Sequence, residues 1–254
     1  ADQAERLSAD GKVTIVNEET FRIGYITMDA TGVTGDTPLK DVKVRQAIAH
    51  AIDRKAIVDA LVRGKSSVVN SACFPSQVGC TQDVVVYDYD PAKAKELLKE
   101  AGYPDGFSID MYAYRDRDYA EAMMGFLGEV GIKANLNFLK YAALRDKIRS
   151  KEVPMAVMTW GSNSINDVSA ITSNFFKHNP DDLAMDDKVK ELLETGEGGF
   201  RPEILRVAVP ALAKGLEKTV LMMRALNVDA AGKGFYEQRD TMEGKLVSLS
   251  LSLS

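Results

Sequence analysis

The chain has 254 residues and is slightly acidic, with 32 basic and 37 acidic side chains and a net charge of −5. Its hydrophobic content of 45% is ample for the core of a soluble, globular protein with one large or two small domains. The sequence has no basic patch and no run of about 18 apolar residues, so neither a nucleic-acid partner nor a membrane span is expected.

Two strands are predicted near the start of the chain. Residues 13–16 form a short apolar run just after a turn-forming Asp-Gly pair. Residues 21–26 carry apolar side chains in near alternation, which is typical of a strand.

Two helices are expected to follow and to meet at a buried corner. Residues 41–54 place apolar side chains at helical spacing on one face. Asp53 is the expected N-cap of the next helix, over residues 54–62, because its carboxylate can accept from free backbone amides. The apolar stripe consists of Val44, Ala47, Ile48, Ala51 and Ile52, and it leaves Lys43, Arg45, Gln46 and His50 on other faces.

The only two cysteines, Cys73 and Cys80, lie in a loop-like run that also contains a proline and a glycine. A disulfide here closes a small ring, adds roughly 2–3 kcal/mol of stability, and indicates a periplasmic or exported protein. Two free thiols in a cytosolic loop are the alternative. No metal site is expected, because there is no second cysteine pair and the only histidines are His50 and His178.

Helical and strand patterns then alternate. Asp90 and Pro91 fit the N-cap and the first residue of a helix. Alternation of this kind predicts an α/β fold with an open, mainly parallel sheet and helices on both faces. The expected helices are 91–101, 119–130 and 141–148, and the expected strands are 107–112, 132–138 and 153–159.

The end of the chain is less informative. Residues 196–245 are expected to form a helical segment, which starts at Pro202 and is broken or kinked at Pro210. Residues 246–254 are a low-complexity tail in which leucine and serine alternate. We assign no function to this tail.

Two runs resemble one known family. PLKDVKVRQAIAHAIDR, at 38–54, is similar to the signature helix of the solute-binding proteins of dipeptide, oligopeptide and nickel ABC importers, and YDPAKAKELL, at 89–98, resembles the same family again. The resemblance covers residues 1–195. It implies the second, C-terminal lobe of a type II periplasmic-binding-protein fold, with the first lobe expected before residue 1. It also implies a periplasmic location and an ABC permease as partner.

Catalysis is not expected. The sequence contains no GxSxG, HExxH, GxGxxG or Walker motif, and both histidines lie in contexts unsuited to a catalytic triad. We therefore predict a binding protein without enzymatic activity and without a cofactor.

Two arginines are the first candidates for solute binding. Arg115 and Arg117 follow a predicted strand and precede a helix. A guanidinium there can bind a carboxylate or a phosphate through two parallel hydrogen bonds, and the helix dipole adds to the attraction. The resemblance also implies an arginine near this point for the acidic end of a ligand. The alternative is that both arginines are solvated and pair with neighbouring aspartates.

The second candidate region follows the predicted strand 153–159, because ligands of open α/β sheets bind at the carboxyl ends of strands. Trp160 can stack on a ligand or serve as a core residue, and Asn166 and Asp167 are possible polar contacts. The resemblance implies an aspartate for the free amine of a peptide where this chain has Asn163. An uncharged amide is a weaker partner for an ammonium group.

These observations predict a lobe that binds a peptide-like or opine-like small solute. A single lobe supplies one wall of the crevice, so we expect the chain alone to bind solute weakly or not at all. The alternative is a self-associating, non-catalytic interaction domain, in which the C-terminal helix and the Leu-Ser tail pair with a second copy.

Overall fold

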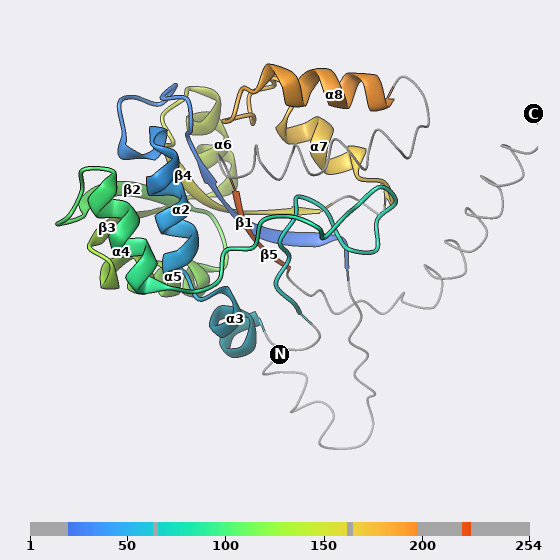
Figure 1. Ribbon diagram of the computed structural model, residues 1–254. Coiled ribbons are helices and arrows are strands. Elements are labelled where there is room, and N and C mark those ends of the chain that lie inside the picture. The colour runs from blue at the N-terminus through green and yellow to red at the C-terminus, as the bar shows by residue number, and fades with distance from the viewer. Residues whose placement is uncertain (1–19, 63–65, 162–164, 198–219, 225–254) are drawn as a thin grey trace, which may run out of the picture.

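A five-stranded sheet in the order β3-β2-β4-β1-β5 is the centre of the fold (Figure 1). The computed structural model describes residues 20–62, 66–161, 165–197 and 220–224. The predicted strand at 13–16 lies outside these ranges. The strands are β1 (Arg22–Met28), β2 (Phe107–Ala113), β3 (Ile132–Phe138), β4 (Met155–Gly161) and β5 (Val220–Arg224).

The sheet is mainly parallel, as the sequence predicts. Strand β2 runs parallel to both β3 and β4, and β1 runs antiparallel to both β4 and β5. Four strands therefore share one direction and β1 alone opposes them. The β2–β3 and β3–β4 connections each contain a helix, α5 (Arg117–Glu129) and α6 (Tyr141–Arg149), as a parallel crossover requires.

Helices cover both faces of the sheet (Figure 1). Helices α2 (Val42–Ala51), α4 (Pro91–Glu100) and α5 pack on one face and share a core with Met111 and Val157. The opposite face packs against α6, α7 (Ser169–Phe175) and α8 (Asp187–Glu197), with Tyr112 and Met158 pointing toward them. Successive strand residues thus enter different cores, which confirms the predicted layers.

The predicted corner after α2 is present. The Asp53 carboxylate accepts from the backbone amide of Ala56 at 2.8 Å, which confirms the N-cap of α3 (Arg54–Ile57). A π-helical turn, Val58–Val62, completes the segment expected to be one helix. Arg45 differs from expectation: it is only 3% exposed, because its guanidinium folds back and donates to the carbonyl of Lys40 at 2.9 Å.

Between residues 90 and 161 the predicted helices and strands are all present. Asp90 caps α4 by accepting from the backbone amide of Lys93 at 2.9 Å. Helix α5 begins at Arg117 rather than at 119, and β4 covers Met155–Gly161 rather than 153–159.

Cys73 and Cys80 form a disulfide, with their Cα atoms 5.7 Å apart. This confirms the predicted bridge and removes the alternative of two free thiols. The bridge closes a loop between the π-helical turn and α4.

The C-terminal segment departs from prediction at β5. Residues 196–245 are expected to be helical, but Val220–Arg224 form a strand that pairs with β1. The edge of β1 offers unpaired backbone groups, and such a tertiary partner can override a helical local pattern. The Leu-Ser tail, Pro202 and Pro210 lie outside the described residues.

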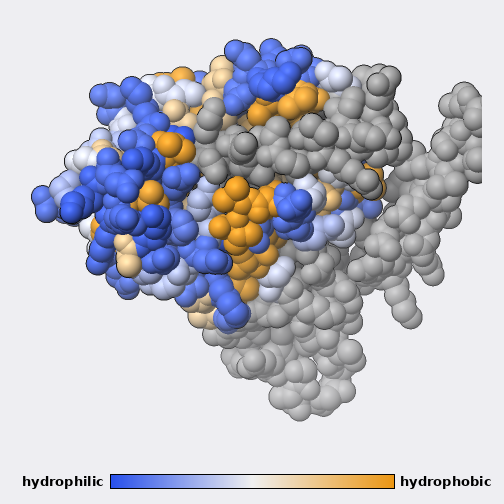
Figure 2. Space-filling model, viewed as in Figure 1, coloured by the Kyte–Doolittle hydropathy of each residue, from blue (hydrophilic) through white to orange (hydrophobic). Residues whose placement is uncertain are grey.

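The described part of the chain has no helix that is both long and apolar enough to cross a membrane. Figure 2 shows a largely hydrophilic surface around α2 and α4, interrupted by an apolar patch where the coil before α4 crosses this face. Val85 and Val86 of this coil are each about half exposed.

Candidate functional site

The carboxyl ends of β2 and β4 lie side by side and carry three of the six predicted site residues, Arg115, Arg117 and Trp160. The two strands pair in parallel, with Ala113 opposite Val157. Just beyond this pair, the hydroxyl groups of Tyr114 and Thr159 form a hydrogen bond of 2.7 Å. Arg115 follows β2, and Trp160 is the next-to-last residue of β4, so both lie at neighbouring strand ends, where open α/β sheets bind ligands.

Arg115 lies at this edge and reaches solvent. Its side chain is 43% exposed, and its Nε atom lies 3.0 Å from the Asp116 carboxylate. Asp116 has a left-handed backbone, with φ of 50°, which is uncommon for a residue other than glycine. Burial raises the pKa of the Asp116 carboxyl, an effect that the Arg115 guanidinium partly opposes. The edge thus combines an accessible cation with a partly desolvated acid.

Arg117 has other partners. It is the first residue of α5, and its Nε atom donates to Glu121 at 2.7 Å, one helical turn later. Its guanidinium also lies 5.5 Å from the centre of the Phe138 ring. Both arginines thus pair with an acid, and Arg115 pairs with a neighbouring aspartate, as the alternative predicts. Arg117 lies beside β3, on the opposite side of β2 from β4, so Arg115 is the better candidate for a site that includes Trp160.

Trp160 forms part of the wall of a cavity of about 230 Å³ on the α6 and α7 face of the sheet. Its ring meets Phe175 of α7 edge-on, with 6.3 Å between the ring centres. Trp160 is only partly buried, so it both packs against the core and faces open space. Trp160 can therefore serve both as a core residue and as a surface on which a ligand stacks.

The cavity also has polar groups in its wall that sequence reasoning missed. Arg145 of α6 forms an ion pair with Asp181, and Tyr25 of β1 lies beside them. Burial, together with the nearby Asp181 carboxylate, raises the pKa of Tyr25 well above its ordinary value. These residues are far apart in sequence and match no motif, so only the fold reveals them.

Asn166 and Asp167 lie against the disulfide loop. The carbonyl of Asn166 accepts from Val78, and the Asp167 carboxylate accepts from the backbone amide of Ser169 at the start of α7. The side-chain oxygen of Asn166 is buried without a hydrogen-bond partner in the described part of the chain. A solute can reach that oxygen only if this loop moves. Asn163 lies outside the described residues.

The sequence profile of the bacterial extracellular solute-binding proteins, family 5 (middle part), matches residues 1–182. The chain belongs to this family. The membership confirms the resemblance of the α2 and α4 sequences to ABC-importer binding proteins.

Individual relatives agree with the family. Heme-binding protein A of Haemophilus influenzae is 29% identical over 167 residues, which are 63% of this chain and 30% of that protein. The dipeptide-binding protein of Escherichia coli is 31% identical over 180 residues, 67% of this chain and 32% of that protein. This chain thus spans about a third of the length of these curated relatives.

Among solved structures, HbpA2 from Haemophilus parasuis matches with a TM-score of 0.77 at 25% identity, over 89% of this chain and 47% of that one. The match confirms the type II periplasmic-binding-protein fold. The family and its named relatives are binding proteins rather than enzymes. Within the described ranges, no group of three or more His, Cys, Asp or Glu side chains is placed to hold a metal ion.

Proposed function

We propose that this chain is one lobe of the solute-binding component of an ABC importer, located in the periplasm. In this role it captures a peptide-like or opine-like solute and delivers it to a membrane permease. The observation that carries the proposal is the position of Arg115 and Trp160 on neighbouring strand ends joined by the Tyr114–Thr159 hydrogen bond. Family membership supports the transport role.

The two side chains suit a small solute with an acidic end. The exposed part of Arg115 can bind a carboxylate, and the Trp160 ring offers a flat apolar surface beside a cavity. Asn163 offers an amide in place of a carboxylate, which favours solutes that do not depend on a charged partner for a free amine. Modified peptides and opines meet this description.

Saturation-transfer NMR on the chain tests this proposal with three probes, the dipeptide Met-Leu, glutathione and mannopine. We expect binding of at least one probe with a Kd of about 1 mM, since one lobe supplies only one wall. Arg115→Ala should weaken it by about tenfold or more, because a charge-assisted hydrogen bond is lost. Arg117→Ala is the matched control and should bind like the wild type, because Arg117 lies beside Phe138 of β3, on the opposite side of β2 from Trp160.

The proposed site would be contradicted if both arginine variants weakened solute binding equally, or if Arg115→Ala did not weaken it at all. Micromolar binding by the chain alone would contradict the proposal that it supplies only one wall of the crevice.

A further inference from the structure

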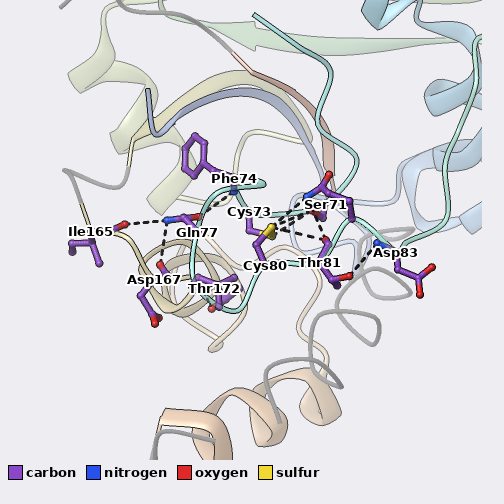
Figure 3. The surroundings of a disulfide bond; sticks show 12 residues. Ser71, Cys73, Phe74, Gln77, Cys80, Thr81, Asp83, Ile165, Asp167 and Thr172 are labelled. Atoms are coloured by element: carbon purple, nitrogen blue, oxygen red, sulfur yellow. Dashed lines mark hydrogen bonds between the residues drawn. A yellow bond between two sulfur atoms is a disulfide. The ribbon is translucent and has the colours of Figure 1, made fainter. Parts of the chain in front are cut away.

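Gln77 joins two segments that are almost ninety residues apart in sequence. It lies in the loop closed by the disulfide and is only 4% exposed. Its side-chain Nε2 group donates to the carbonyls of Ile165 and Asp167, at 3.1 and 3.2 Å (Figure 3). Its Oε1 atom accepts from the backbone amide of Phe74 at 3.1 Å. Both protons and the oxygen of this buried amide are therefore used.

The backbone beside Gln77 strengthens the same connection. The amide of Val78 donates to the carbonyl of Asn166 at 3.3 Å, and the amide of Val168 donates to the carbonyl of Val78 at 3.1 Å. Together with the two side-chain bonds, four hydrogen bonds hold residues 165–168 against the disulfide loop. Residues 165–168 lead from β4, which carries Trp160, into α7.

The disulfide holds the loop that contains Gln77 in place. Cys73 and Cys80 flank Gln77 and restrict the conformations open to the loop between them. Phe74, next to Cys73, packs against Phe21 with ring centres 5.1 Å apart. Phe21 directly precedes β1, whose first residue pairs with Gly161 at the end of β4. The disulfide loop thus borders the strand end that carries the proposed site.

We propose that Gln77 is a positioning residue for the solute site, and that the Cys73–Cys80 disulfide keeps it in position. Gln77 fixes residues 165–168, which precede α7, so that Trp160 of β4 keeps one position when solute binds. This inference rests on the proposed function for its effect on solute affinity. Its effect on the segment itself needs no solute.

Hydrogen exchange of backbone amides, followed by mass spectrometry, tests the inference with Gln77→Glu. This variant keeps the acceptor for Phe74 but turns a carboxylate toward two carbonyl oxygens. Exchange in residues 165–170 should rise at least about tenfold, because two hydrogen bonds are replaced by repulsion. Exchange in α4 and α5, on the other face of the sheet, should not change. The double variant Cys73→Ser/Cys80→Ser should act in the same direction.

Gln82→Glu is the matched control. Gln82 lies on the other side of the disulfide, is exposed, and donates to Ser71 Oγ at 2.6 Å. The same change of charge there should leave exchange in residues 165–170 unaltered, because Gln82 does not contact that segment in the described structure. The emission maximum of Trp160, the only tryptophan of the chain, should shift in Gln77→Glu and not in Gln82→Glu.

Unchanged exchange in residues 165–170 of Gln77→Glu would overturn the inference, and so would an equal rise throughout the protein, which indicates general destabilisation. Binding of Met-Leu, glutathione or mannopine should weaken at least about fivefold in Gln77→Glu, measured at a temperature at which the variant is fully folded. If exchange rises locally but the affinity of a bound probe is unaltered, Gln77 holds the segment without positioning the site, and the inference fails. If no probe binds the wild type, the proposed solute site at Arg115 and Trp160 fails for these solutes, and the exchange result still decides whether Gln77 fixes the segment.

Discussion

The hydroxyl groups of Tyr114 and Thr159 lie 2.7 Å apart and join the carboxyl ends of β2 and β4. Backbone pairing between these strands covers only Met111–Ala113 and Met155–Val157. The side-chain bond extends the connection beyond the last backbone pair, toward Arg115 and Trp160. This bond therefore adds a direct link between the two strand ends near these residues.

Tyr114→Phe should destabilise the protein by about 1 kcal/mol, because one partly buried hydrogen bond is lost while the ring is kept. Urea unfolding measures this difference. Thr159→Val removes the same bond from the other side, and the double variant should cost little more than either single variant. Additive costs would show that the two hydroxyls do not interact.

Gly106→Ala should be strongly destabilising, by about 3 kcal/mol or more. Gly106 has a φ of 76°, and a Cβ atom there would lie 1.9 Å from the carbonyl oxygen of Gly131. Gly125, inside α5, is the control, since a Cβ atom there meets nothing within 4 Å. Gly125→Ala should raise stability by about 0.5–1 kcal/mol, since alanine favours a helix. Thermal unfolding of both variants checks the contrast.

Removing the disulfide in Cys73→Ser/Cys80→Ser should lower the free energy of unfolding by about 2.5 kcal/mol, as expected for a ring of this size. Reduction of the wild type should give the same loss. If the reduced wild type and the double variant differ, the serine side chains have effects of their own beside buried Ser71.

The buried carboxylate of Asp29 should make the stability of the protein depend on pH. Its carboxylate is fully buried and accepts hydrogen bonds from the backbone and hydroxyl groups of Thr31 and Thr34. Burial alone raises the pKa of this carboxyl, but these bonds outweigh burial and lower it below 3.8. A lowered folded-state pKa adds stability above pH 3.8, and this stability is lost as the pH falls through the folded-state value.

Asp29→Asn should therefore be less stable than the wild type near neutral pH, and the difference should shrink below about pH 3. Asp105→Asn, at an exposed position, is the control. Urea unfolding at a series of pH values measures the difference. A constant difference between wild type and Asp29→Asn at all pH values would contradict the assignment.

The sequence predicts those features of the fold that depend on contacts between residues close together in the chain. The stripe of α2 and the caps at Asp53 and Asp90 depend on neighbours within one helical turn, so the sequence predicts them. The contact of Arg117 with Glu121 is equally local, because residues four apart share a helix face, but the partner expected for this arginine is a neighbouring aspartate.

Other features depend on partners far away in the chain. The burial of Arg45, the pairing of β5 with β1, and the bonds from Gln77 to residues 165–167 arise only when distant segments meet. Residue type alone does not predict such contacts. Sequence reasoning likewise finds Trp160 by its place after a strand, but it does not find the Arg145–Asp181 pair beside the same cavity.

The most direct test of the proposed solute site is chemical-shift mapping of backbone amides during titration with the probe that binds. We predict that the shifts concentrate at residues 113–117 and 158–161, the adjoining ends of β2 and β4, and that Arg115→Ala strongly reduces them at the same probe concentration. Shifts centred on α2 and α4, on the other face of the sheet, would contradict this site.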